Sequence, residues 1–587
     1  MCGIIGYTGG KAAAKIIYEG LKRLEYRGYD SAGISVLCDS EIRTVKRLGR
    51  VSALGGFLGK MHGSTGIGHT RWATHGKPSD ENAHPHNSGM FSIVHNGIIE
   101  NYSQLKSEYL LGESFLSDTD SEVIVKLLNK FYDGDLPSSL ARVCGLLRGS
   151  YALAVICAQF DGIAVAKRGS PVIIGYGENE NFVASDLPAL AGMCKNVAVL
   201  NDGDIALLTA DGVAIFDENL QGVIREILPN PAKPADLELS GCPHYMLKEI
   251  REVPAAIERT CQAYAYVENS VKKALAGVDR VIITGCGTAY NSGLAAKRYI
   301  ESFARIPAEA EIAGEFRYKN PVVTSRTAVI AVSQSGETAD TVEAAELALS
   351  LGAKVIAVTN SPYSRLTRCA DVVVPVEAGC EICVAATKSY SGQITALYMI
   401  ARTLAGFSAQ SSADRIAPFP ALCAQTAERE DIDGLADMCA RSYGTYFLGR
   451  DTDYAVAQEG SLKLKEVSYV PSEGYPAGEL KHGTLALIDI RTVSVFIITR
   501  PDLAEKCSNA VEQVLSRKGK AAVITNVTEV AERFKDRAYV IEIPPCDEWL
   551  SPLVSSEVLQ LLAYKTALLL DRDPDKPRNL AKSVTVE

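Results

Sequence analysis

An internal repeat in the second half of the chain constrains the fold most. Apolar strand patterns recur there in the same order, and each first strand leads into a long helical pattern. The strands are predicted at residues 281–285, 328–333 and 355–359 in one copy, and at residues 446–450, 493–499 and 522–525 in the other. Strands that alternate with helices indicate a parallel sheet. The repeat therefore predicts two copies of one doubly wound α/β domain.

The first part has a different pattern, in which short strands are separated by turns and interrupted by helices at residues 12–24 and 121–131. Asp120 or Thr119 is the predicted cap of the second helix. This pattern predicts an α+β layered (αββα) domain. Periodicity stops at a proline-rich stretch, residues 229–234, which reads as a linker. The predicted divisions are residues 1–225, a linker 226–244, α/β copies 245–415 and 416–570, and a tail 571–587.

The bulk composition excludes several classes of protein. The chain has 587 residues, a net charge of -10 and no block of basic residues, which argues against nucleic acid or an anionic membrane as a partner. No apolar run is long enough to span a bilayer, and no signal peptide is recognisable. Fifteen scattered cysteines predict reduced thiols in the cytoplasm. The pair Cys380 and Cys383 lacks further ligands, so no metal site is expected.

Two small-residue loops end neighbouring strands of the first α/β copy. One runs from Ser333 to Thr338 and combines hydroxyls, a glycine and backbone N–H groups at a helix start. The other is Gly285-Cys286-Gly287-Thr288. Because ligands of open α/β sheets bind at the carboxyl ends of strands, the two loops predict one site for the monophosphate group of a small organic molecule. A plain helix cap is the alternative.

The second copy lacks the hydroxyl loop and carries ionisable residues instead. Glu459, Lys463 and Glu466 share one helical face, which alone reads as a surface stripe of salt bridges. His482 stands in a glycine-flanked loop, where a histidine is more often functional than on an apolar face. One copy is therefore expected to bind phosphate while the other supplies catalytic groups or structure.

The first residues, Met1-Cys2-Gly3, offer a possible nucleophile. Removal of Met1 would leave Cys2 with a free α-amino group of pKa near ~8, which could accept the thiol proton. By position alone, an ordinary buried cysteine is the simpler interpretation.

Motifs at both ends of the chain resemble a known family. Cys2-Gly3-Ile4, the stretch from Arg71 to Gly76, His95-Asn96-Gly97 and Thr119-Asp120 resemble class II glutamine amidotransferase domains of the N-terminal-nucleophile hydrolase type. The repeat resembles two sugar isomerase (SIS) domains. With the tail 577–587, the whole chain resembles the glutamine–fructose-6-phosphate aminotransferases (isomerising) of bacteria from end to end.

The resemblance implies roles for residues of the first part. Cys2 would attack the glutamine amide, and Asn96 with the Gly97 N–H would form the oxyanion hole. Arg71 would hold the α-carboxylate and Asp120 the α-ammonium group of glutamine. Trp72, Thr74 and His75 would line the same pocket.

In the second part, the resemblance implies a catalytic role for three residues. Lys582 would form a Schiff base with the sugar, Glu466 would move a proton between C1 and C2, and His482 would open the ring. The implied sugar-phosphate residues are Thr288, Ser333, Gln334, Ser335, Thr338, Glu381 and Lys463. Two departures from the family pattern, Ala289 and Ala386 in place of serine, each remove a hydroxyl and predict weaker sugar-phosphate binding.

The expected function is glutamine-dependent amination and isomerisation of D-fructose 6-phosphate to D-glucosamine 6-phosphate, with L-glutamate as the second product. Ammonia would pass internally between the two sites, no cofactor is implied, and the family implies a homodimer. Two alternatives stay open: a paralogue for another phosphosugar, and a non-catalytic sugar-phosphate sensor. An amidophosphoribosyltransferase is disfavoured because the chain has SIS repeats and no phosphoribosyl loop.

Overall fold

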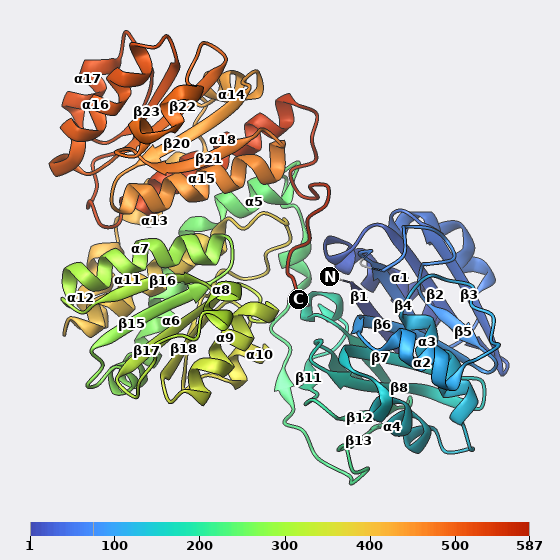
Figure 1. The fold of residues 1–587 in the computed structure, drawn as a ribbon. Helices are drawn as coiled ribbons and strands as arrows, with labels where there is room; N and C mark the ends of the chain where they lie inside the picture. Colours follow the sequence, from blue (N-terminus) through green and yellow to red (C-terminus); the bar gives the residue numbers. More distant parts are fainter. Residues whose placement is uncertain (1, 74, 586–587) are drawn as a thin grey trace. The chain divides into compact units, whose positions relative to one another are not determined.

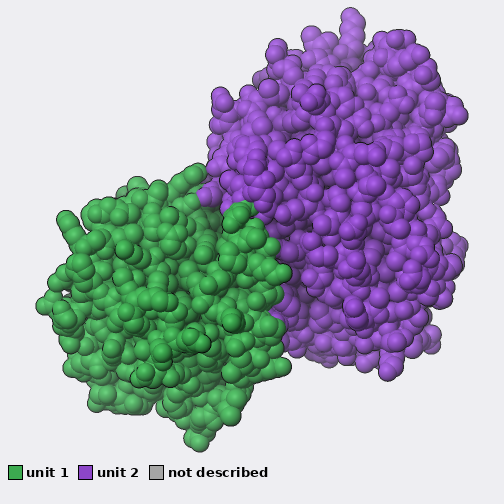
Figure 2. Space-filling model, turned by 180° about the vertical axis from the view of Figure 1, so that it is seen from behind, with its two compact units in different colours: residues 1–238, 581–587 green, residues 239–580 purple. Residues whose placement is uncertain are grey.

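The computed structural model describes residues 2–73 and 75–585 of the chain. They form two compact units: residues 1–238 with 581–587, and residues 239–580 (Figure 2). Figure 1 labels the helices and strands of both. Among the described residues, no helix has the length and apolar character needed to cross a membrane.

Unit 1 contains two antiparallel sheets. The eight-stranded sheet has, in spatial order, β14 (Leu228–Pro229), β11 (Asn196–Val199), β9 (Ile173–Tyr176), β10 (Glu180–Ala184), β1 (Gly3–Gly9), β4 (Thr65–Arg71), β2 (Ser31–Cys38) and β3 (Glu41–Leu48). The six-stranded sheet has β13 (Val213–Phe216), β12 (Ile205–Leu208), β8 (Phe160–Arg168), β7 (Gly149–Cys157), β6 (Phe91–Ile99) and β5 (His86–Ser88).

The two sheets of unit 1 pack face to face, and helices cover their outer faces. Ile4, Val94 and Val165 belong to the apolar core between the sheets. Helix α1 (Ala13–Leu24) packs on the larger sheet, while α3 (Ser121–Phe131) and α4 (Leu136–Leu146) share a core with the smaller one. A short helix, α2 (Tyr102–Tyr109), precedes α3. This arrangement confirms the predicted αββα fold class.

Unit 2 contains two parallel five-stranded sheets with the same strand order. The first has β16 (Ala308–Ile312), β15 (Arg280–Gly285), β17 (Thr327–Ser333), β18 (Lys354–Thr359) and β19 (Val372–Pro375). The second has β21 (Ser472–Pro476), β20 (Gly444–Gly449), β22 (Thr492–Ile498), β23 (Lys520–Thr525) and β24 (Tyr539–Glu542). The matching order confirms the predicted repeat of one doubly wound domain.

Helices surround both sheets of unit 2. Those of the first copy are α5 (Tyr245–Arg251), α6 (Val253–Ala274), α7 (Thr288–Phe303), α8 (Ala313–Tyr318), α9 (Ala339–Ser350), α10 (Arg365–Arg368) and α11 (Lys388–Leu404). Those that follow are α12 (Ala409–Ile416), α13 (Phe419–Ala427), α14 (Asp433–Ala440), α15 (Thr452–Ser468), α16 (Ala504–Leu515), α17 (Thr528–Phe534) and α18 (Ser551–Leu569). One apolar core includes residues of both copies, among them Ile330, Ile400, Leu464 and Leu559.

Candidate active sites

The thiol of Cys2 lies directly before β1, beside the end of β4. The Trp72 N–H donates to its Sγ over 3.2 Å, and Asn96 Nδ2 donates to the Cys2 carbonyl over 3.0 Å. Burial raises the pKa of the Cys2 thiol, although the Trp72 N–H and the charge of Arg71 oppose this effect. A thiol with a raised pKa is protonated at neutral pH, so it needs a base before it can act as a nucleophile.

Arg71, the last residue of β4, has one side of its guanidinium occupied and one side open. Its Nη2 donates to the carbonyl of Gly76 over 3.0 Å and to the carbonyl of His75. Its Nη1 is buried and has no partner among the described residues. A buried guanidinium nitrogen without an acceptor is costly, so the arrangement suits a carboxylate ligand.

Asn96 and Gly97 lie in β6, opposite Ala152 and Tyr151 of β7. Gly97 has φ +129°, and a Cβ there would lie 2.0 Å from the Ser150 carbonyl oxygen, so no larger residue fits. The Asn96 side chain is held at both ends, since its Nδ2 contacts Cys2 and its Oδ1 lies 3.0 Å from His69 Nε2. These residues provide N–H donors near the thiol.

Asp120 does not act as the predicted helix cap. Helix α3 does begin after it, but its side chain makes no capping bond. Its Oδ2 instead accepts the Ile99 N–H over 2.7 Å, and its Oδ1 is 3.4 Å from Ser121 Oγ. The carboxylate is therefore turned toward β6, and the buried residue lines the pocket.

One pocket of unit 1 brings most of the predicted glutamine residues together. It is lined by Cys2, Arg71, Trp72, His75, His84, His95, Gly97, Thr119, Asp120 and Ser121. The predicted residue Thr74 lies outside the described residues, and the predicted residue Asn96 does not itself line the pocket. The sequence prediction missed His84, Thr119 as a lining residue, and Ser121, whose Oγ is 2.8 Å from His95 Nδ1. The close recurrence of histidines at positions 84, 86 and 95 was the available signal.

In unit 2, the loop from Ser333 to Thr338 connects β17 to the N-terminus of α9. Ser333 Oγ accepts the Gly336 N–H over 3.0 Å, and Ser335 Oγ accepts the Glu337 N–H over 3.1 Å. Gly336 has φ +64°, and a Cβ there would lie 2.0 Å from Ser364 Oγ. The hydroxyls thus shape a tight loop at a helix N-terminus, the location that favours an anion.

The charged stripe on α15 is buried, so its interpretation as a surface feature was wrong. Glu459 and Lys463 side chains are each 1% exposed. Lys463 Nζ lies 2.6 Å from Glu466 Oε2 and 3.0 Å from Thr288 Oγ1 on α7. Glu459 accepts hydrogen bonds from Thr288 over 3.0 Å and from Asn291 over 2.8 Å. The cluster therefore joins α15 to the loop that ends β15.

Burial affects the two central charges of this cluster differently. It raises the pKa of Glu459, and the nearby Lys463 charge only partly opposes this. Burial by itself would lower the pKa of Lys463. The negative charges of Glu466 and Glu459 outweigh the effect of burial, so the pKa of Lys463 is raised. Lys463 therefore stays positive beside two carboxylates, a charge arrangement suited to proton transfer on a bound sugar.

Three other predicted sugar-site residues lie on other segments of the chain. The Glu381 carboxylate accepts the N–H groups of Thr387 and Ser389, both over 3.0 Å, and so holds the loop that contains Ala386. His482 ends a short 3₁₀ helix (Leu480–His482) and is exposed. Within the described part of the chain, no hydrogen bond or ion pair joins its ring to the cluster. Lys582 is assigned to unit 1.

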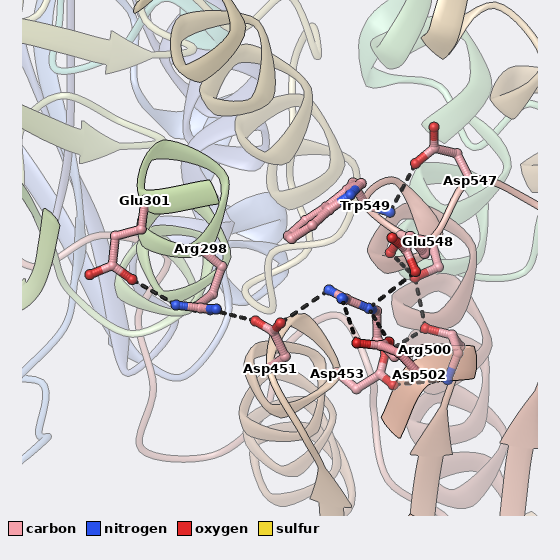
Figure 3. Close-up of polar contacts among 11 residues, drawn as sticks. Arg298, Glu301, Asp451, Asp453, Arg500, Asp502, Asp547, Glu548 and Trp549 are labelled. Carbon is pink, nitrogen blue, oxygen red and sulfur yellow. Dashed lines mark hydrogen bonds and ion pairs between the residues drawn. The ribbon is translucent and has the colours of Figure 1, made fainter. Parts of the chain in front are cut away.

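The strand ends of the second copy carry an ion network in place of a phosphate loop (Figure 3). Arg500 follows β22, and its Nη1 lies 3.0 Å from Asp451 Oδ2, while Arg298 of α7 contacts the other oxygen of Asp451 over 2.5 Å. Trp549 stacks on the Arg500 guanidinium at 4.4 Å. Within the described residues, these charges are paired with one another.

Two family models match the chain. A glutamine amidotransferase domain matches residues 57–237, and an SIS domain matches residues 274–402 and again 441–570. The first match lies in unit 1 and the other two lie in unit 2.

Full-length relatives carry one shared name, glutamine–fructose-6-phosphate aminotransferase [isomerizing]. The protein of Caldanaerobacter subterraneus subsp. tengcongensis is 43% identical over 611 residues, and that of Thermus thermophilus is 44% identical over 607 residues. The alignments cover 100% of this chain and of each relative.

Solved structures resemble unit 2. The C-terminal domain of glucosamine-fructose-6-phosphate aminotransferase from Francisella tularensis has a TM-score of 0.55 and 34% identity, and it covers 58% of this chain and 99% of that one. A protein from Silicibacter pomeroyi named putative phosphosugar isomerase has a TM-score of 0.51 at 22% identity, so it supports only the fold.

Proposed function

Because this chain belongs to the glutamine–fructose-6-phosphate aminotransferase (isomerizing) family, we infer that it transfers the amide nitrogen of L-glutamine to D-fructose 6-phosphate. The products are L-glutamate and D-glucosamine 6-phosphate. One observation carries the amidotransferase half: Cys2, Arg71, Gly97 and Asp120 line a single pocket.

In the amidotransferase half, the substrate is held at its α-carbon and attacked at its amide. The open edge of Arg71 binds the α-carboxylate, and the Asp120 carboxylate binds the α-ammonium group. Once Met1 is removed, the new α-amino group takes the proton of the Cys2 thiol. Sulfur then attacks the amide carbon, and Asn96 Nδ2 with the Gly97 N–H stabilises the oxyanion. Ammonia leaves, and water hydrolyses the thioester to glutamate.

In the isomerase half, the phosphate group of D-fructose 6-phosphate binds at the N-terminus of α9. Its partners are the predicted residues Thr288, Ser333, Gln334, Ser335 and Thr338. Lys582 forms an imine with the keto carbon, which activates it toward ammonia without a cofactor. Glu466 moves the proton between C1 and C2, next to the fixed charge of Lys463, and His482 opens the sugar ring.

The enzyme acts as a cytoplasmic homodimer at the first step of hexosamine synthesis, and ammonia reaches the sugar without release. The likeness to full-length relatives supports this, as do fifteen cysteines without a disulfide, which suit a reducing compartment. Light scattering of the purified protein tests the dimer.

The decisive experiment compares two nitrogen donors. Protein with a verified Cys2 N-terminus is assayed for glucosamine 6-phosphate with glutamine and with ammonium. Cys2→Ala should lose the glutamine-dependent reaction and keep the ammonium-dependent one. Lys582→Arg should lose both while it still hydrolyses glutamine. If the unmodified protein made no product with either donor, a sugar-phosphate sensor would replace this proposal. A different aminated sugar would point to a paralogue.

A further inference from the structure

His69 lies behind the glutamine pocket and contacts its predicted oxyanion donor. The residue is completely buried in β4, two positions before Arg71, and it does not line the pocket itself. Its Nε2 lies 3.0 Å from Asn96 Oδ1 and 3.0 Å from the His95 carbonyl oxygen. It therefore contacts the side-chain amide of Asn96 without lining the pocket.

The hydrogen-bond partners determine which ring nitrogen is protonated. The His95 carbonyl can only accept, so Nε2 must carry the proton. At the other end, the Cys2 carbonyl can only accept from the Asn96 amide, which places Nδ2 beside Cys2 at 3.0 Å. A flipped Asn96 amide would set donor against donor at His69 and acceptor against acceptor at Cys2. The chain Cys2 C=O, Asn96 amide, His69 Nε2–H thus has one consistent arrangement.

The surroundings keep the ring in this state. Burial lowers the pKa of His69 to about 3, so the imidazole is neutral at any working pH. The ring stacks on His84 with centroids 4.2 Å apart and planes 21° apart. His84 is itself held, because its Nδ1 accepts the His95 N–H over 3.3 Å. A neutral, fixed ring can orient a neighbour but cannot exchange protons with substrate.

We propose that His69 is a positioning residue that fixes the orientation of the Asn96 amide. One of the two hydrogen atoms on Nδ2 is then donated to the Cys2 carbonyl, and the other faces the developing oxyanion. This inference rests on the proposed glutaminase chemistry. A positioning role differs from a packing role in a testable way, because only a side chain with an N–H donor at the position of Nε2 can hold Asn96 Oδ1.

A matched pair of substitutions isolates that donor. In His69→Gln, the amide nitrogen can occupy the place of Nε2, whereas in His69→Asn it reaches only the place of Nδ1. Both variants bury one amide of similar size. We expect glutaminase kcat to fall about 10- to 100-fold in His69→Asn, since loss of an oxyanion donor itself costs roughly 10²–10³. His69→Gln should stay within about 5-fold of the unmodified enzyme, and KM for glutamine should change little in either.

The same protein supplies the controls. Ammonium-dependent synthesis should be unchanged in both variants, and Thr70→Val, which removes a buried hydroxyl without a partner on the opposite face of β4, should leave glutaminase activity unchanged. Equal effects of Gln and Asn, with or without loss of ammonium-dependent synthesis, would overturn the inference, as would a rise in KM at constant kcat. If the unmodified protein lacked glutaminase activity, the proposed function itself would fail.

Discussion

At the scale of single residues, burial decides how a polar group acts. Arg71 is buried with one nitrogen that has no acceptor among the residues the structure describes, whereas Lys463 is buried with carboxylates on two sides. The first arrangement suits a ligand that brings its own negative charge. The second holds a positive charge in place between two carboxylates.

Substitution of Arg71 tests the carboxylate contact. Arg71→Met should raise KM for glutamine roughly 10- to 100-fold, because hydrogen bonds to a charged group contribute about 1.5–3 kcal/mol. Steady-state glutaminase assays measure this. Arg47→Met, at an exposed ion pair with Asp80 in the same unit, serves as the control and should change nothing. An unchanged KM in Arg71→Met would exclude this residue as the carboxylate ligand.

The two alanines in the sugar-phosphate loops predict weakened binding. Ala289 lies in the first turn of α7, and Ala386 lies in the loop held by Glu381. Restored hydroxyls in Ala289→Ser and Ala386→Ser should each lower KM for fructose 6-phosphate about 5-fold, equivalent to ~1 kcal/mol. The measurement is ammonium-dependent synthesis, which bypasses glutamine. No decrease in KM in either variant would refute the prediction.

Asp453, at the N-terminus of α15, predicts a pH effect on stability. Burial raises its pKa from 3.8 to about 7, while Thr499 donates to it from its N–H over 2.8 Å. Between these pH values the unfolded state releases the proton and the native state keeps it, so stability falls as pH rises.

Asp453→Asn should remove this dependence. The difference between the unfolding temperatures of the variant and the unmodified protein should increase as the pH is raised from about 4 to about 7. Above about pH 7 this difference should stay level. Calorimetry of both proteins across this range measures the difference. A difference that is constant with pH would show that Asp453 is ionised in the native state.

At the scale of elements, the two copies keep one backbone geometry and use it differently. Gly287 before α7 and Asp451 before α15 have nearly the same dihedral angles, φ 54°, ψ -123° and φ 57°, ψ -124°. In the first copy this turn leads to Thr288 and the sugar-phosphate loops. In the second copy, the Asp451 side chain pairs with Arg298 of α7 and with Arg500, which follows β22. These ion pairs link α7 to the end of β22.

The ion network predicts unequal effects of its two arginines. Arg500→Met leaves Asp451 without its buried partner and should destabilise unit 2 by about 3–5 kcal/mol. Arg298 is 38% exposed, so Arg298→Met should cost less than about 1 kcal/mol. Urea unfolding followed by a probe in unit 2 compares them. Equal losses would contradict this assignment of the buried pair.

The elements differ in how far the sequence predicts them. Central strands such as β17 and β22 are continuous apolar runs and are predicted within one residue of their ends. The edge strands β16 and β21, with sequences AEAEI and SEGYP, lack such runs and were not predicted. Pairing with a central neighbour stabilises them, and that contact is not visible locally.

At the scale of the molecule, the two SIS repeats form one unit with a shared core. Helix α11 is buried along almost its whole length, and α15 packs against both α7 and α18. The buried Glu459–Lys463 pair can exist because residues of both copies surround it. Two independent domains would leave that face of α15 in water.

The proposed transfer of ammonia between two sites predicts isotopic selectivity. With amide-¹⁵N glutamine and unlabelled ammonium present together, glucosamine 6-phosphate should carry mainly ¹⁵N, because internally released ammonia is used before it mixes with solvent. Mass spectrometry measures the label. Cys2→Ala is the control and should give unlabelled product. A label that follows the bulk ammonium ratio would mean that ammonia escapes.

The sequence by itself determined the fold class, the repeat and the family. Periodicity depends on local pattern, and the motifs around Cys2, Arg71 and Asn96 are contiguous. Only the tertiary structure decided that Glu459 and Lys463 of α15 are buried, that Asp120 faces β6, and that His69 contacts Asn96. These facts depend on contacts between distant segments, and such contacts set burial and proton positions without leaving a local pattern.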